Sequence, residues 1–292
     1  MQMIPFRSSK IVRRVLRMAV LVAFSLGVVA VWALYISVRP PRISSDVTPK
    51  NFSVPYEDVS FTTRDGITLA GWFVPSAASS TKTIVALHGY PADKGDILPA
   101  VVFLQKTYNL FLFDFRYFGK SAGAYTTVGM RETEDLRAAI AFLKTRGITQ
   151  VGVWGFSMGG AVALMASSQT SEIAAVAAES SYARLDLMAS RLFRVPVLNR
   201  VLGSLVTWLG KALVRIDVTK VSPQAAAEKI TIPVLLIHSQ DDEVIPFSHA
   251  KLLQEALGHN TRAEFWFEEN LAHGEFSAKY QPRIEEFFAK NL

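Results

Sequence analysis

The chain contains 292 residues, half of them apolar, and carries a formal net charge of +6. It has no cysteine, which excludes disulfides, thiolate metal sites and cysteine nucleophiles. Eight Lys or Arg and one Asp lie within the first 50 residues, so the rest of the chain is close to neutral. A nucleic-acid groove needs a basic face on the folded domain, and this distribution does not predict one.

An uncharged run of 21 residues extends from Met18 to Val38. As a helix it would span ~31 Å, the thickness of a bilayer core. Basic residues are concentrated before the run, in residues 1–17, so the positive-inside bias predicts a cytoplasmic N-terminus. The following domain would lie in a periplasm, at a cell surface or in a lumen. A signal peptide cleaved after Ala33 is the alternative, but the run continues five residues further, which favours an uncleaved anchor.

Residues 39–55 contain four prolines together with several Ser, Thr and Asn. This composition predicts an extended linker that holds the domain off the bilayer surface.

Apolar periodicity in residues 56–292 predicts strands that alternate with helices. The expected strands are 58–63, 67–74, 83–87, 109–113, 151–154, 173–178, 233–237 and 263–267, the first two forming an antiparallel hairpin. The expected helices are 97–106, 132–146, 161–167, 247–257 and 281–291. Continuously apolar strands with helices between them predict an α/β fold, with a mainly parallel eight-stranded sheet covered on both faces.

Residues 182–229 interrupt this alternation and are too long for an ordinary connection, so we interpret them as a helical insertion. Between Leu202 and Ile216 the apolar residues fall on one helical face, while Lys211 and Arg215 share the other. We expect this insertion to be a lid that covers an acyl pocket; packing on the core and contact with lipid headgroups are the alternatives.

A short turn at residues 155–159 has the pattern G-x-S-x-G between an expected strand and an expected helix. In such a turn the central serine, Ser157, is held in a strained conformation at the strand tip, and the flanking glycines avoid collisions. The N-terminus of the helix directs backbone N–H groups toward the same point, which suits a developing oxyanion. Ser157 is therefore the candidate nucleophile.

A serine nucleophile needs a base, and the base needs a carboxylate. Of five histidines, His273 lies just past the last expected strand, on a loop that should project at the same sheet edge as Ser157. For the acid, Asp241, Asp242 and Glu243 follow the strand 233–237, and spacing alone does not separate them.

Five segments together form a recognisable pattern. They are Gly155-Phe-Ser-Met-Gly159, His88-Gly89, Asp114-Phe-Arg-Tyr-Phe-Gly-Lys-Ser121, His238-Ser-Gln-Asp-Asp-Glu-Val-Ile-Pro246 and His273-Gly274. In these segments the chain resembles the α/β-hydrolase superfamily, in particular its membrane-anchored serine hydrolases described as Bem46-like, lysophospholipase-like or serine-aminopeptidase-like. The order of the residues, Ser then Asp then His, agrees with that family.

The resemblance implies a role for particular residues. It places the acid at Asp242 and the oxyanion-hole donors at the backbone N–H groups of Tyr90 and Met158, whose side chains would then be free to vary. It implies that Asp114 and Arg116 are structural ties of their loop.

Two residues depart from the family pattern. Ser239 and Tyr117 stand where glycines are usual. Each is expected to reshape a pocket wall without touching the triad.

The function implied is hydrolysis of lipid-like or other acyl esters through an acyl-enzyme on Ser157, which requires no metal or organic cofactor. A serine peptidase or thioesterase of the same fold is the first alternative, and a catalytically inactive membrane-tethered scaffold is the second. A peptidase would need acids to bind a substrate amine, for which the insertion offers Asp186 and Asp217.

Overall fold

Eight strands form one sheet in the computed structural model, which describes residues 10–189 and 198–292. The first two strand pairs are antiparallel and all the others are parallel. In sheet order the strands are β1 (Glu57–Thr62), β2 (Thr68–Val74), β4 (Asn109–Phe113), β3 (Lys82–Leu87), β5 (Gln150–Phe156), β6 (Ile173–Glu179), β7 (Val234–Ser239) and β8 (Ala263–Glu268). The predicted eight-stranded, mainly parallel sheet is confirmed.

Each face of this sheet buries its own hydrophobic cluster. Along β4, Phe111 and Phe113 point into one cluster while Leu110 and Leu112 point into the other, as the two-residue period of a strand requires. The first cluster is covered by α3 (Glu132–Thr145), α4 (Met158–Ser167), α7 (Pro223–Ala227) and α8 (Phe247–Ala256), and the second by α2 (Lys94–Val101) and α9 (Tyr280–Asn291). The result is a three-layered domain.

The observed helix α2 (Lys94–Val101) begins and ends earlier than the helix expected at residues 97–106. Asp93 caps α2 by accepting hydrogen bonds from the N–H groups of Gly95 and Asp96, so the helix starts at Lys94. It contains Pro99 and gives way at Val102 to a 3₁₀ helix, η2 (Val102–Lys106).

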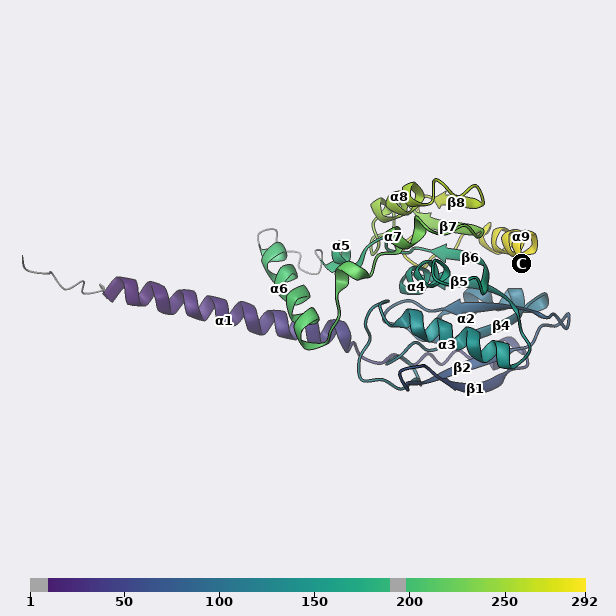
Figure 1. The fold of residues 1–292 in the computed structure, drawn as a ribbon, viewed down its shortest axis with the longest axis horizontal. Helices are drawn as coiled ribbons and strands as arrows, with labels where there is room; N and C mark the ends of the chain where they lie inside the picture. The colour runs from purple at the N-terminus through teal and green to yellow at the C-terminus, as the bar shows by residue number, and fades with distance from the viewer. Residues whose placement is uncertain (1–9, 190–197) are drawn as a thin grey trace, which may run out of the picture.

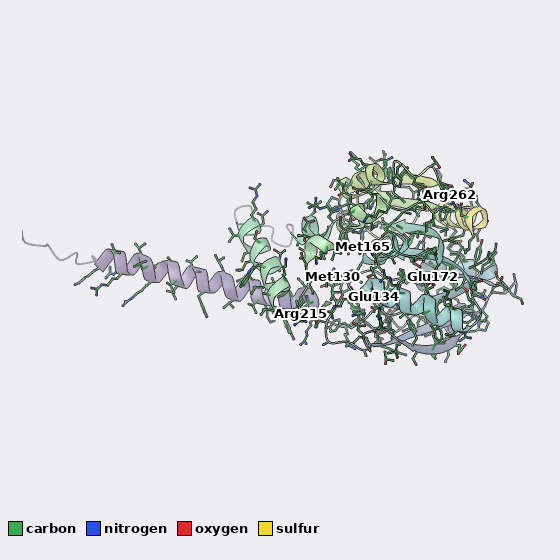
Figure 2. All side chains as sticks on the ribbon, viewed as in Figure 1. Met130, Glu134, Met165, Glu172, Arg215 and Arg262 are labelled. Carbon is green, nitrogen blue, oxygen red and sulfur yellow. The ribbon has the colours of Figure 1, made fainter. Side chains whose placement is uncertain are left out.

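The N-terminal helix α1 (Lys10–Val38) projects away from the domain and is long and apolar enough to cross a membrane (Figure 1). Its side chains stand clear of the domain over the N-terminal part of the helix (Figure 2). One face of its last turns, in contrast, is buried against the insertion helix α6 (Leu198–Leu213), while Trp32 and Tyr35 remain exposed. The end of the uncharged run is therefore covered by protein on one face.

The apolar face predicted for the insertion helix packs on α1. The two helices and the turn after α6 share one small hydrophobic cluster. Arg215 belongs to that turn and lies at the C-terminal end of α6 (Figure 2). Its buried members are Ala30, Ala33, Leu34, Val38, Leu202, Val206 and Ile216.

Both ends of the predicted insertion, 182–229, belong to the main core instead. Tyr182 and Ala183 at one end, and Val221 and Ala227 at the other, lie in the first sheet cluster. Between them come α5 (Leu185–Ala189), α6 and η3 (Val218–Lys220), and part of the predicted insertion, residues 190–197, lies outside the described residues. Residues 1–9 of the predicted cytoplasmic segment are likewise outside them.

The segment 39–55 packs along the surface of the domain. Tyr117 Oη donates a hydrogen bond to Pro40 O (2.7 Å), and the guanidinium of Arg42 lies over the Tyr117 ring. Further along, the Ser45 N–H donates to Asp93 Oδ2 (2.9 Å). The predicted linker is therefore joined to the domain at several points, and its role in keeping the domain off a bilayer stays a prediction.

A buried carboxyl, Glu179, stands at the end of β6. It faces the second cluster beside Tyr280 and Trp154, and burial raises the pKa of Glu179 to about 8. The side chain is therefore protonated in the folded protein at neutral pH.

We expect Glu179→Gln to remove a pH-dependent loss of stability. The unfolded carboxyl ionises above its ordinary pKa of 4.5, whereas the folded one stays protonated up to about 8, so the folded state loses stability as pH rises through this window. The variant should gain on wild type by up to about 1.4 kcal/mol per pH unit there. Thermal unfolding of the full chain in detergent micelles at several pH values measures this. The exposed Glu228→Gln is the control, and a difference between Glu179→Gln and wild type that does not change with pH would contradict the expectation.

Candidate active site

Ser157 occupies a sharp turn between β5 and α4. Its backbone has φ 54° and ψ −115°, in a region that residues with a side chain rarely adopt. The flanking glycines make the turn possible, because a Cβ on Gly155 would lie 2.4 Å from Gly159 O and a Cβ on Gly159 would lie 2.3 Å from Leu87 O. The Ser157 N–H donates to Glu179 O (2.8 Å), which ties the turn to the neighbouring strand. The strained backbone of Ser157 is thus held in place by the close packing of the two glycines and by this hydrogen bond.

Ser157, His273 and Asp242 form a continuous chain of side-chain contacts. His273 Nε2 lies 3.2 Å from Ser157 Oγ, and His273 Nδ1 lies 2.7 Å from Asp242 Oδ2. A carboxylate can only accept, so Nδ1 carries the proton and Nε2 is left to accept from the serine hydroxyl. The three residues come from the ends of β5, β7 and β8, which meet at one sheet edge.

The three neighbouring acids have different partners. Asp242 alone among them contacts the imidazole, while Asp241 Oδ2 accepts from the Asn270 N–H (2.7 Å) and Glu243 Oε2 accepts from the His273 N–H (3.1 Å). Asp241 and Glu243 therefore hold the backbone of the histidine loop. Sequence reasoning did not find the Glu243 contact, since adjacent acids give no signal of which backbone each one meets.

The carboxylate of Asp242 is stabilised in its charged form. Burial alone would raise the pKa of Asp242, but the hydrogen bonds from His273 and from the Ile245 N–H outweigh it, so the pKa lies below its ordinary value. The side chain is fully enclosed. It is thus ready to fix the orientation of His273 and to stabilise its cation.

The other histidines have structural partners. His88 donates from Nδ1 to Gly89 O (2.7 Å) and accepts at Nε2 from the Phe115 N–H (3.0 Å), and burial lowers its pKa, so it is neutral. His238 contacts Ile245 O, His249 accepts from the Ala183 N–H, and the exposed His259 contacts Ala256 O. Within the described part of the chain no group of three or more His, Asp or Glu is placed to hold a metal ion.

A cavity of about 240 Å³ opens over Ser157. Tyr90 and Met158, the expected sources of oxyanion N–H groups, line it together with the serine. Most of the remaining lining is apolar and comes from the loops after β4, β6 and β7, from α5, from α6 and the segment after it, and from the end of α1. It includes Leu34, Val38, Val128, Leu185, Met188, Val206, Ile216, Val244 and Ile245.

The side chain of Tyr90 is not free. Its hydroxyl donates to Ser37 O at the end of α1 (3.0 Å). The expectation that its side chain is free to vary is therefore wrong. The contact joins residues 53 positions apart, and no local pattern signals it.

The two departures from the family pattern are explained by other contacts. Tyr117 adopts φ 75°, the left-handed conformation that favours glycine, and uses its ring and hydroxyl to hold the segment after α1. The Ser239 hydroxyl accepts from the Asp241 N–H (3.2 Å). Neither residue is among those described as lining the cavity, so the expected effect on a pocket wall is not seen.

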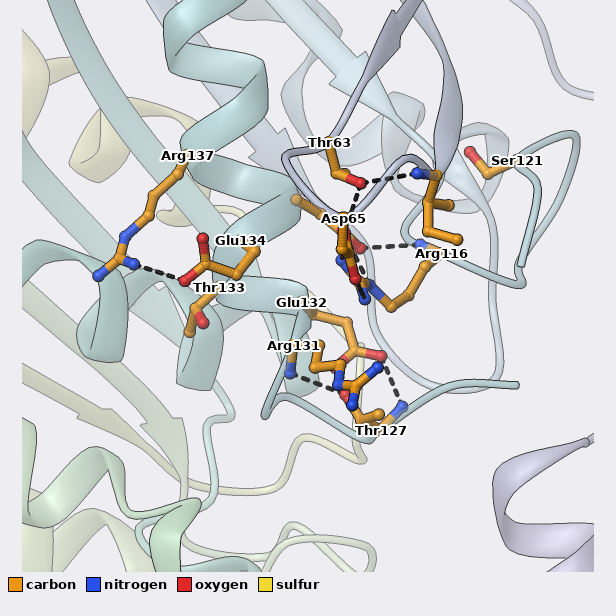
Figure 3. A network of polar contacts seen from close by, with 12 residues as sticks. Thr63, Asp65, Arg116, Ser121, Thr127, Arg131, Glu132, Thr133, Glu134 and Arg137 are labelled. Carbon is orange, nitrogen blue, oxygen red and sulfur yellow. Dashed lines mark hydrogen bonds and ion pairs between the residues drawn. The ribbon is translucent and has the colours of Figure 1, made fainter. Parts of the chain in front are cut away.

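The loop after β4 is held by buried ion pairs, as expected for Asp114 and Arg116. Asp114 pairs with Lys94 (2.6 Å), and Arg116 pairs with Asp135 (2.6 Å) and with Asp65 (2.8 Å; Figure 3). These contacts tie the loop after β4 to α2, to α3 and to the turn before β2.

Comparisons with known proteins agree with this fold. Residues 82–214 match the family described by the alpha/beta hydrolase fold. An esterase of Pyrococcus furiosus superposes with a TM-score of 0.73 at 32% identity, over 87% of this chain and 98% of the esterase. Protein YfhR of Escherichia coli K12 is 31% identical over 68% of this chain, and protein bem46 of Schizosaccharomyces pombe is 27% identical over 68%.

The chain belongs to the α/β-hydrolase family. It spans about two thirds of the length of YfhR and bem46, namely 66% and 64%. The fold and the esterase likeness together support hydrolase activity.

The elbow should not tolerate a side chain at Gly159. In Gly159→Ala the new methyl group would meet backbone atoms of Leu87 and His88 well inside contact distance, so the turn must shift. We expect a loss of about 2–4 kcal/mol of folding free energy. Thermal unfolding measures it, with Gly210→Ala as the matched control, since a Cβ there meets its nearest atoms at 3.6 Å. Equal unfolding midpoints for Gly159→Ala and wild type would contradict this account of the turn.

Proposed function

We propose that the protein is a membrane-anchored serine hydrolase that cleaves carboxylic esters with lipid-like or other acyl groups. One observation carries the proposal: Ser157, His273 and Asp242 lie in hydrogen-bonding order beneath an apolar cavity. This order of nucleophile, base and orienting acid is what acyl transfer requires.

In the proposed mechanism Ser157 Oγ attacks the ester carbonyl carbon while His273 Nε2 takes the hydroxyl proton. The tetrahedral oxyanion accepts hydrogen bonds from the N–H groups of Tyr90 and Met158, each worth on the order of 3 kcal/mol of barrier. When the intermediate collapses, His273 gives the proton to the departing alcohol. A water molecule, activated by the same imidazole, then attacks the acyl-enzyme and releases the acid. No step uses a metal or an organic cofactor.

The cavity supports an acyl substrate. Its lining is apolar, and burying each methylene of a chain there gains ~0.8 kcal/mol. A thioesterase would use the same machinery. The peptidase alternative is weaker, because Asp186 is paired with Arg184 and Asp217 with Lys211 (3.0 Å), which leaves their charges already engaged. A catalytically inactive scaffold would not need the hydrogen-bonded series of side chains that runs from Ser157 through His273 to Asp242.

The proposed anchor is α1. Its length and apolar composition suit a bilayer. The basic residues before it favour a cytoplasmic N-terminus and an extracytoplasmic domain, in a periplasm, at a cell surface or in a lumen.

The direct test is Ser157→Ala in the full chain, purified in detergent micelles. We expect hydrolysis of p-nitrophenyl acyl esters to fall to background and fluorophosphonate labelling of the protein to disappear, because the nucleophile is gone. Wild-type rates in the variant, or a folded wild-type protein that takes no label on Ser157, would refute the mechanism.

The choice of acid has its own test. Asp242→Asn removes the charge that orients His273, and we expect kcat to fall by about 10⁴-fold, as in other triads. Asp241→Asn is the matched control: the amide oxygen of the new side chain can still accept from the Asn270 N–H, so the histidine loop keeps its tie and kcat should stay near the wild-type value. Equal losses in the two variants would remove Asp242 from its assigned role.

A further inference from the structure

The cavity over Ser157 is closed on one side by the helix proposed as the membrane anchor. Leu34, Ser37 and Val38, from the last turns of α1, line it together with Val206 and Gly210 of α6. We propose that these turns of α1 are a wall of the acyl-binding pocket, and that Leu34 sets the length of acyl chain that fits. The inference rests on the proposed function and adds a specificity-determining residue to it.

The end of α1 is fixed to the domain by hydrogen bonds. The last carbonyls of a helix lack donors within the helix. Here Ser37 O accepts from the Tyr90 hydroxyl (3.0 Å), and Val38 O accepts from the Thr126 N–H (3.0 Å). Thr126 is itself held, because its hydroxyl donates to the buried Glu132 (2.6 Å), which also binds Thr127 (Figure 3). The wall is therefore part of the domain.

The same turns of α1 also pack against α6. Leu34 is only 8% exposed and shares a cluster with Leu202 and Val206. Gly210 leaves room for it, since a Cβ added there would lie 3.6 Å from Leu34 Cδ1. Moving α1 outward would expose this cluster to solvent, so packing and hydrogen bonds keep the wall in the same place.

The chemistry of the wall suits hydrocarbon. Ser37 is its polar member, and the Ser37 hydroxyl donates to Ala33 O (2.7 Å), which satisfies it within the helix. A dry cavity of ~150 Å³ is known to hold benzene, and by the same ratio about 240 Å³ corresponds to a chain of roughly ten carbons. Medium-length acyl chains are the substrates for which this wall matters most.

The experiment measures selectivity instead of rate. For the full chain in detergent micelles, kcat/KM is determined for p-nitrophenyl decanoate and p-nitrophenyl butyrate. In Leu34→Trp the indole occupies the cavity, and we expect the decanoate-to-butyrate ratio to fall at least about tenfold. In Leu34→Ala the cavity is longer and the ratio should rise. Leu21→Trp, the same exchange at an exposed position of the same helix, should leave the ratio at the wild-type value.

The ratio does not depend on how much of each variant is folded, since both esters report on the same active molecules. Gly210→Ala gives a milder test, because it adds one methyl group to the cavity rim without a clash and should lower the ratio by a smaller factor. If the decanoate-to-butyrate ratio is unchanged in both Leu34 variants while Ser157 is still labelled by fluorophosphonate, α1 does not form a wall of the acyl pocket, but the proposed function is not contradicted. A folded wild-type protein with neither label nor ester hydrolysis would overturn the proposed function and the wall with it.

Discussion

The contact between the first turn of α4 and the end of β3 is the constraint on which the site depends. Gly159 lies so close to Leu87 and His88 that only hydrogen fits between them. This approach fixes three things together: the strained backbone of Ser157, the N-terminus of the helix behind it, and the loop that carries Tyr90. Because the parallel strands end at the same edge, the loops after β7 and β8 then bring Asp242 and His273 to the same point.

A second set of contacts extends from this centre to α1. Tyr90 belongs to the loop beside the elbow and also binds the last turn of α1, while Tyr117 binds the segment that follows. The apolar helix is therefore joined to the domain by hydrogen bonds and by the cluster it shares with α6. In this protein the segment with the strongest membrane signal is also a structural part of the domain.

The sequence was sufficient for the fold and for the residues that the structure brings together. Long apolar strands and helical periods are local signals. Ser157 follows from its G-x-S-x-G turn, and His273 follows from the rule that loops after parallel strands share an edge. The assignment of the acid needed the family resemblance, because Asp241, Asp242 and Glu243 differ only in which partner each one meets after folding.

The packing of residues 39–55 and the burial of Leu34 were not predictable in this way. An apolar run looks the same whether lipid or protein covers it, and a stretch rich in proline can be free or packed. The reason for Tyr117 at a position where glycine is usual could not be predicted either, because its hydrogen-bond partner, Pro40, is 77 positions away in the sequence.

The burial of the end of α1 divides this helix into two parts with different freedom to change. From Met18 to Ser25 the side chains are exposed, and there any apolar residue of similar length would suit the proposed membrane span equally well. From Leu26 onward the helix has specific neighbours in α6 and in the domain. An unrelated hydrophobic helix could therefore replace the first part but not the second. The proposed anchor is therefore exchangeable for another apolar helix over its first part only.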